Sequence, residues 1–343
     1  MIPTALLTWE QFTLHLRNPF RLSYGVSETR QAFCVRLAGD EGWGEGTIPP
    51  YYGVDPADMM ACWERASRRT DPLPEEPEQV PGWVGTDGPA PARSALDLAL
   101  YDRMARKRGV PLYELLGLPQ PQPMATSFTI AIDTPQEMAR LASEVPGYGI
   151  IKVKLGSEDD EARLAAIRQA RPDVRLLVDA NAGWTRDNAR QLVKTLMQYN
   201  VELIEQPLRK DDIEGMGRVQ AECPVPVVAD ESVQTYEQVE RLAAAGVQGI
   251  NVKLMKVGGL TPALHILRRC QELGLRVMLG SMIETSVGIT AMAHLAGMAD
   301  WLDLDAPLLV SNDPFEGVRI DANAVLCLPE RPGIGVALKA DAL

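Results

Sequence analysis

Apolar runs alternate with amphipathic segments through the last two thirds of the chain, at a spacing of roughly 25 residues. The apolar runs predict short buried strands over residues 124–132, 149–155, 174–180, 201–207, 225–231, 249–255, 275–281 and 301–307. The amphipathic segments predict helices over residues 135–145, 158–171, 186–199, 212–222, 235–246, 261–274 and 286–299. Eight strands alternating with seven helices are typical of parallel βαβ units, and this number predicts a closed barrel whose last helix is missing or altered. A doubly wound open sheet is the alternative, but no GxGxxG motif follows the first strand.

The first third of the chain shows no such cycle. Residues 4–16 and 31–47 predict antiparallel strands, the second with a GDEG turn, and residues 56–70 and 89–109 predict helices. A proline-rich stretch without periodicity follows at 116–125 and has the composition of a domain boundary. We therefore expect an α+β domain over residues 1–120 and a barrel over 121–307. The tail, 308–343, returns to loops and short strands.

Composition narrows the classes of function. The 343 residues carry a net charge of −12, which disfavours binding to nucleic acid or to an anionic membrane surface. The chain start shows no signal peptide, and no apolar run reaches the roughly 18 residues needed to span a bilayer. Five scattered cysteines without CxxC spacing indicate reduced thiols, as in a cytoplasmic protein. No histidine lies in a metal-binding motif, so any metal must be held by carboxylates.

Charged residues close the predicted strands in phase with the repeat. Because the ends of barrel strands meet at one mouth, three of these acids, Asp179, Glu205 and Asp230, are expected to converge there. Three carboxylates repel one another unless a cation joins them, and oxygen ligands suit Mg²⁺, with Mn²⁺ as a second option. The alternative is that each acid simply caps the helix that follows its strand.

Lysines stand on either side of these acids. Lys154 and Lys253 belong to the second and sixth predicted strands, which lie opposite each other in an eight-stranded barrel. A lysine near a metal and other cations loses proton affinity and can act as a general base. Lys152 points the same way as Lys154 and is expected to supply such a charge, and to reach the substrate carboxylate. Lys256 competes with Lys253, but it falls after the predicted strand.

Several motifs resemble the enolase superfamily, in particular its muconate-lactonizing-enzyme subgroup. They are IKVKLG, VDANAGW, IEQP, ADES, INVKLMKVGG and GSMIETSVGITAMAHLA, and the resemblance extends over essentially the whole chain. It implies a (β/α)7β barrel, a modified TIM barrel, under an α+β cap that the C-terminal tail completes. It also implies Mg²⁺ ligands at Asp179, Glu205 and Asp230, and acid–base lysines at 154 and 253. This family chemistry is the general acid–base pattern of an enediolate stabilised by Mg²⁺.

The segment DLDAP narrows the resemblance to dipeptide epimerases. Asp303 and Asp305 resemble the acidic pair that binds the α-ammonium of a dipeptide in those enzymes. The resemblance then implies a 1,1-proton transfer at the α-carbon of the C-terminal residue, with Lys154 acting on the L-epimer and Lys253 on the D-epimer. A capping or solvated acidic pair is the alternative. N-acylamino-acid racemase, cycloisomerase and o-succinylbenzoate synthase activities stay open, as does a metal-binding barrel without turnover.

Substrate preference is expected to come from two cap segments, 19–30 and 49–56. Tyr24, Tyr51 and Tyr52 are the candidate contacts there, and Arg21 or Arg30 could pair with an acidic side chain. The Ala–Glu epimerases of the family carry an arginine where this chain has Gly25, so small or apolar L,L-dipeptides are expected. Family members commonly form homo-oligomers.

Overall fold

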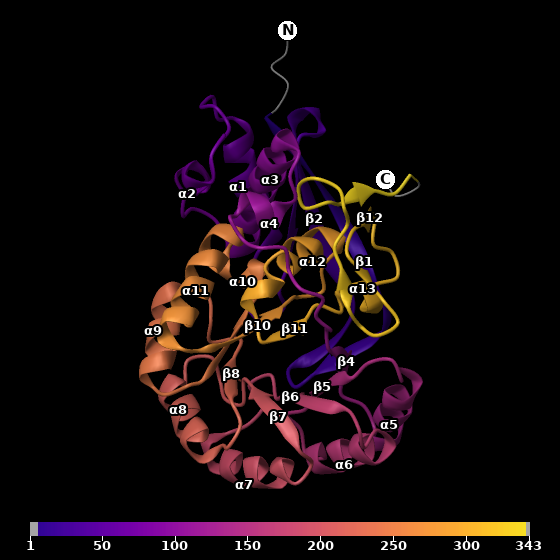
Figure 1. Cartoon of the computed structure of the whole chain (residues 1–343). Coiled ribbons are helices and arrows are strands. Elements are labelled where there is room, and N and C mark those ends of the chain that lie inside the picture. The colour runs from indigo at the N-terminus through magenta and orange to yellow at the C-terminus, as the bar shows by residue number, and fades with distance from the viewer. Residues whose placement is uncertain (1–5, 341–343) are drawn as a thin grey trace.

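The computed structural model describes residues 6–340 and contains an eight-stranded parallel barrel (Figure 1). Neighbouring strands follow one another in sequence order, and the ring closes through a parallel bridge between Thr126 and Leu302. The predicted barrel is therefore confirmed, and the open-sheet alternative is wrong. The strands are β4 (Phe128–Ile130), β5 (Ile150–Lys154), β6 (Arg175–Asp179), β7 (Val201–Glu205), β8 (Val227–Ala229), β9 (Gly249–Val252), β10 (Arg276–Gly280) and β11 (Trp301–Asp303).

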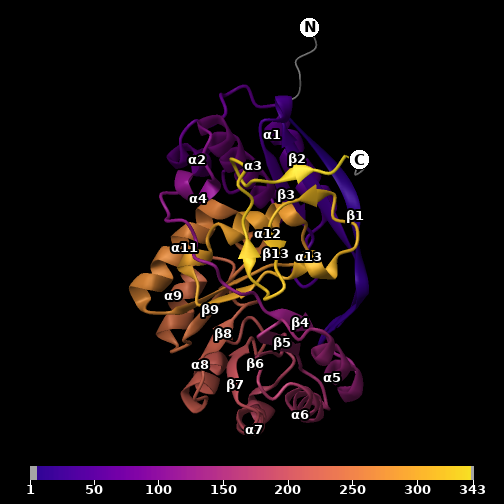
Figure 2. The ribbon, with the colours of Figure 1, turned by 45° about the vertical axis from the view of Figure 1, so that its right-hand side comes forward.

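Helices surround the barrel and connect successive strands (Figures 1 and 2). Several begin at capping threonines: Thr185 and Thr235 each accept a bond from the backbone N–H three residues on, and that residue's side chain bonds back. The helices are α5 (Pro135–Glu144), α6 (Asp160–Ala170), α7 (Arg186–Met197), α8 (Ile213–Glu222), α9 (Tyr236–Ala244), α11 (Leu260–Leu273) and α12 (Ser286–Ala293). A short additional helix, α10 (Leu254–Val257), stands between β9 and α11.

Alternation along the strands decides which side chains reach the barrel interior. In β6, Leu176 and Val178 pack outward in the large core shared with the helices, whereas Leu177 belongs to a separate cluster inside the barrel. Because side chains alternate, Asp179 follows Leu177 inward, one step nearer the mouth. The inner cluster fills the lower barrel and so forms the floor of the site; it comprises Ile150, Leu177, Leu203, Val228, Met278 and Trp301.

The N-terminal part forms a three-stranded antiparallel sheet backed by helices. Its strands are β1 (Leu7–Leu22), β2 (Gly25–Leu37) and β3 (Trp43–Thr47), and its helices are α1 (Pro56–Ser67), α2 (Val80–Val84), α3 (Ala90–Arg108) and α4 (Leu112–Leu115). Helix α3 lies so close to β3 that a Cβ built on Gly44 would stand 1.8 Å from the Ala95 carbonyl oxygen. Only glycine permits this contact, which seats the sheet on the helix.

The tail joins the cap to the barrel. Helix α13 (Ala306–Leu309) lies beside β1, where Val310 bridges to Leu16. Two short pairs follow, β12 (Phe315–Glu316) with β15 (Ala337–Leu338) and β13 (Arg319–Ile320) with β14 (Leu326–Cys327). The carbonyl of Ala324 accepts a hydrogen bond from the backbone N–H of Thr126, just before the first barrel strand begins. Figure 2 shows this last part of the chain running alongside both units.

Some predicted elements are wrong in detail. Segment 19–30, expected to be a loop, forms the end of a long hairpin whose strands β1 and β2 are joined only by Ser23 and Tyr24. The strand predicted over 249–255 ends at Val252, because α10 begins there. Thr4 and Ala5, in the first predicted strand, lie outside the described residues. None of the described helices combines the length and hydropathy needed to cross a membrane.

Candidate active site

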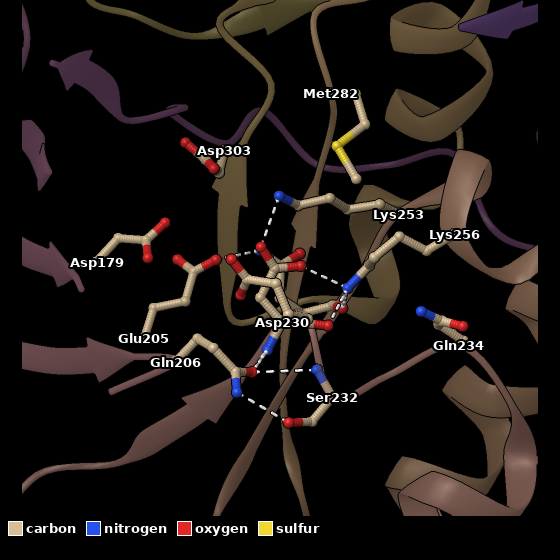
Figure 3. A network of polar contacts seen from close by, with 12 residues as sticks. Asp179, Glu205, Gln206, Asp230, Ser232, Gln234, Lys253, Lys256, Met282 and Asp303 are labelled. Carbon is tan, nitrogen blue, oxygen red and sulfur yellow. Dashed lines mark hydrogen bonds and ion pairs between the residues drawn. The ribbon is translucent and has the colours of Figure 1, made fainter. Parts of the chain in front are cut away.

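Three buried carboxylates meet at the mouth of the barrel. Asp179 ends β6, Glu205 ends β7 and Asp230 directly follows β8, and each offers an oxygen within 4.8 Å of the other two. Parallel register explains the convergence, since Asp179 is aligned with Glu205 across the two strands. Figure 3 shows Asp179 and Glu205 on one side of Asp230, with Lys253 and Lys256 approaching from the other side. The predicted triad is therefore brought together.

A lysine binds each end of this triad. Lys154 Nζ donates to Asp179 Oδ2 at 2.6 Å, and Lys253 Nζ donates to Asp230 Oδ2 at 2.8 Å. Lys154 ends β5 and Lys253 follows β9, the second and sixth strands of the ring, so the amines reach the triad from opposite walls. Lys256, from α10, is also buried and bonds both the carboxylate and the carbonyl of Asp230.

Opposing charges act on the ammonium of Lys253. Burial and the neighbouring Lys152 ammonium both lower its pKa, as predicted. The carboxylates of Asp230 and Glu205 outweigh them, and the pKa of Lys253 is raised above its ordinary value. In Asp230 the same pairing overcomes the effect of burial and holds the carboxyl pKa below its usual range. Among the chain's own groups the acids therefore dominate the pKa of Lys253, and the lowering expected from a bound metal stays a prediction.

Lys152 lies below the pocket in a cage of carboxylates. Its fully buried ammonium stands 2.6 Å from Asp303 Oδ2, 2.7 Å from Glu205 Oε2 and 3.2 Å from Asp179 Oδ2. Burial alone lowers the pKa of Lys152, but these acids hold it well above its ordinary value. Three carboxylates therefore compensate Lys152, which shares one face of a largely apolar strand with Lys154.

Replacing Lys152 with methionine is expected to lower the free energy of unfolding by about 3–5 kcal/mol in EDTA, because it leaves buried carboxylates without their counterion. Urea unfolding measures the change. Lys194→Met, on the exposed face of α7, is the matched control and should stay within roughly 0.5 kcal/mol of the parent. Equal stability of the two variants would contradict a structural charge balance centred on Lys152.

The acidic pair Asp303 and Asp305, at the end of the eighth barrel strand (β11), is buried beside the first barrel strand (β4). Asp303 Oδ1 accepts hydrogen bonds from the hydroxyls of Ser127 and Thr129, at 2.8 and 3.3 Å, and Asp305 Oδ2 accepts one from Thr129 N at 2.6 Å. Burial would raise the pKa of Asp303, but Lys152 brings it down to about 2. Burial and the charge of Asp303 raise the pKa of Asp305 to about 7. The two neighbours therefore ionise differently.

Above these groups lies a cavity of about 690 Å³, part of it open to solvent. The cap supplies one wall, where Tyr24 and Tyr51 pack with ring centroids 5.2 Å apart. Of the predicted site residues, Lys154, Asp230, Lys253, Asp303, Asp305, Tyr24 and Tyr51 line this cavity, whereas Lys152, Asp179 and Glu205 lie beneath its lining.

Some lining residues were missed by the sequence analysis. Asn181 lies in the motif VDANAGW with Asp179, and Glu231 lies in ADES with Asp230, so their position in those motifs was an available signal. Their side chains bond each other, Asn181 Nδ2 to Glu231 Oε1, at 3.2 Å. Ile283 and Leu309 gave no such signal, because they are apolar residues, one in a loop and the other at the end of α13.

Comparison with known proteins places the chain in a family. Residues 136–342 match the family model described as enolase C-terminal domain-like. The chain belongs to this family. The resemblance to the enolase superfamily is thus confirmed. An L-Ala-D/L-Glu epimerase of Bacteroides thetaiotaomicron is 35% identical to this enolase-superfamily chain over 336 residues, which cover 96% of it and 87% of the relative.

Solved structures agree with this assignment. A dipeptide epimerase from Enterococcus faecalis, complexed with Mg and L-Leu-L-Tyr, matches with a TM-score of 0.91 and 32% identity, covering 97% of this chain and 99% of that one. An N-succinyl Arg/Lys racemase from Bacillus cereus matches with a TM-score of 0.92 and 26% identity, covering 98% and 95%. Shape alone therefore does not separate these two activities.

Proposed function

We propose that this enolase-superfamily protein is a Mg²⁺-dependent dipeptide epimerase, an isomerase that inverts the α-carbon of the C-terminal residue. The observation that carries the proposal is the placement of two amines on opposite walls of one pocket, Lys154 on Asp179 and Lys253 on Asp230. An inversion by proton transfer needs a base on one face of the carbon and an acid on the other. The dipeptide epimerases among its relatives support the substrate class.

The carboxylate triad fits a magnesium ion. Its donors are all oxygen atoms, and they lie close enough to share one cation. Glu205 Oε2 is buried and, among the described residues, receives no well-directed hydrogen bond, although the Lys152 ammonium is 2.7 Å away. Burial and Asp179 raise the pKa of Glu205 to about 7, as expected of a carboxylate that lacks sufficient positive charge. When bound, Mg²⁺ supplies Lewis acidity toward the substrate carboxylate and balances the charge of the triad.

The two lysines divide the proton transfer. Lys154 Nζ takes the α-proton of the L-epimer, which leaves a planar enediolate, and the Lys253 ammonium gives a proton to the opposite face. The reverse reaction exchanges their roles, so neither direction consumes a co-reactant. Asp303 and Asp305 line the same pocket, which supports the proposal that they bind the substrate α-ammonium of a free dipeptide, a group that an N-acylated amino acid lacks.

Incubation in D₂O with a mixed set of L,L-dipeptides tests the proposal. We expect deuterium at the α-carbon of the C-terminal residue together with the L,D product, both followed by NMR. N-succinyl amino acids serve as the competing substrates, because the Bacillus cereus racemase acts on N-succinyl Arg/Lys. Turnover of N-succinyl amino acids with dipeptides untouched would overturn the assignment. A barrel that binds metal without turnover would leave every compound unlabelled.

Other features belong to the same proposal. Five free cysteines, four of them buried, support a cytoplasmic location. We also propose the division into a cap, 1–120 with 308–343, and a barrel, 121–307; residues 1–5 and 341–343 lie outside the described residues. A homo-oligomer stays a prediction.

A further inference from the structure

One cation in the pocket wall has no acidic partner. Arg30, on β2 of the cap hairpin, lines the cavity, and among the described residues its guanidinium forms no ion pair. Within residues 6–340, its one side-chain hydrogen bond joins Nη2 to Ser27 Oγ at 3.1 Å. Its Nε atom is buried without a partner in the described part of the chain. Arg30 as a whole is half-buried, and this burial lowers the pKa of its guanidinium.

The other cations near the pocket are already engaged. Lys154 and Lys253 bind carboxylates of the triad, and Arg21, on the same hairpin as Arg30, pairs with Asp133 at 3.1 Å near the surface. Lys210 Nζ lies 5.3 Å from the centre of the Tyr51 ring, a cation–π contact. Arg30 is therefore the lining cation for which the described residues provide no compensating charge.

A second unused donor stands in the same wall. The Tyr52 hydroxyl is buried without a partner among the described residues, and Tyr52 lines the cavity together with Arg30. Burial and the charge of Asp230 raise the pKa of Tyr52, so the phenol keeps its proton and can donate. A guanidinium and a phenol, both unsatisfied, are complementary to a negatively charged acceptor, and a carboxylate accepts from both.

From these contacts we propose that the physiological substrate is a dipeptide with a carboxylate side chain, which binds Arg30 and Tyr52. The inference rests on the proposed epimerase function and deepens it. It replaces the expectation of small or apolar dipeptides, which depended on Gly25 alone. The sequence left Arg21 and Arg30 open as partners of an acidic side chain, and of these two Arg30 lines the pocket, whereas Arg21 pairs with Asp133.

Matched pairs of dipeptides test the inference. We expect kcat/KM for L-Ala-L-Glu to exceed that for the isosteric L-Ala-L-Gln by roughly 10- to 100-fold, because the amide leaves the cation uncompensated. L-Glu-L-Ala and L-Gln-L-Ala form a second pair, and an acidic preference in either pair supports the inference. Arg30→Met should bring the ratio of the preferred pair close to one, mainly through KM.

Two further variants separate recognition from folding. Arg30→Lys keeps the charge and should retain part of the acidic preference, whereas Arg21→Met, on the same hairpin, should retain all of it. The Tm of Arg30→Met should not fall, because Arg30 has no ion pair to lose. A wild-type preference for amide or apolar dipeptides, or a ratio unchanged in Arg30→Met, would overturn the inference while leaving epimerisation intact. Absence of α-deuteration in every dipeptide would instead overturn the epimerase proposal itself.

Discussion

Replacing either Lys154 or Lys253 with alanine is expected to reduce inversion of the dipeptide by roughly 10²–10⁴-fold, the usual contribution of a positioned acid or base. The losses should differ in kind. Without Lys154, Lys253 remains and should still exchange the α-proton of the D-epimer with D₂O, without converting it to the L-epimer. The Lys253→Ala variant should show the opposite selectivity. Proton NMR of each separate epimer measures exchange and inversion in the same sample.

This pattern distinguishes two opposed bases from a single lysine that serves both faces. A one-base enzyme would lose all exchange in one variant and keep full turnover in the other. Circular dichroism and urea unfolding establish that both variants are folded. Near-wild-type inversion by either variant would refute the assignment of the amines that bind Asp179 and Asp230.

Removing divalent metal is expected to lower kcat/KM by roughly 10³-fold, since metal-ion stabilisation of developing charge contributes several kcal/mol. Dialysis against EDTA followed by stepwise addition of MgCl₂ should restore activity. Mg²⁺ should also raise Tm, because it binds the folded chain, by an amount equivalent to about 2.7 kcal/mol at 100 times its Kd. This thermal shift does not depend on turnover.

A pair of variants on one strand locates the ion. Glu205→Gln removes a carboxylate of the triad and should abolish the Mg²⁺-induced rise in Tm. Glu202→Gln is the control, because Glu202 lies on the same strand β7 but binds Arg175 and the Trp301 indole. Its response to Mg²⁺ should match that of the parent. An undiminished thermal shift in Glu205→Gln would place the ion elsewhere.

The barrel was predictable because strands and helices alternate at a regular spacing in the sequence, and this spacing indicates how they are arranged in space. Once strands recur at a fixed interval, residues at strand ends must share one rim, and the convergence of Asp179, Glu205 and Asp230 follows. The helix boundaries were also close, since Thr185 and Thr235 are recognisable capping residues. The strand predicted beyond Val252 failed because Leu254 and Met255 are apolar in either structure, and periodicity cannot separate a short buried helix from a strand.

The cap has no comparable repeat, so the sequence did not predict which of its residues line the pocket. Arg30 lies within a strand of the hairpin, where an alternating pattern does not reveal that the pocket lies on its side. The electrostatics were out of reach for a related reason. Whether Lys253 gains or loses proton affinity depends on the balance between burial and Asp230 from another strand, which only a folded geometry fixes.

The acidic wall of the pocket lies across the seam where the barrel closes. Ser127 and Thr129, from the beginning of the ring, hold Asp303 and Asp305 at its end, more than 170 residues later in the chain. Because closing so long a loop is entropically costly, we expect this pairing to form late in folding. During synthesis, a nascent chain in which Trp301 and the residues after it have not yet left the ribosome cannot assemble the proposed ammonium site. Substrate binding would then require a fully closed barrel, and incomplete chains would have no epimerase activity.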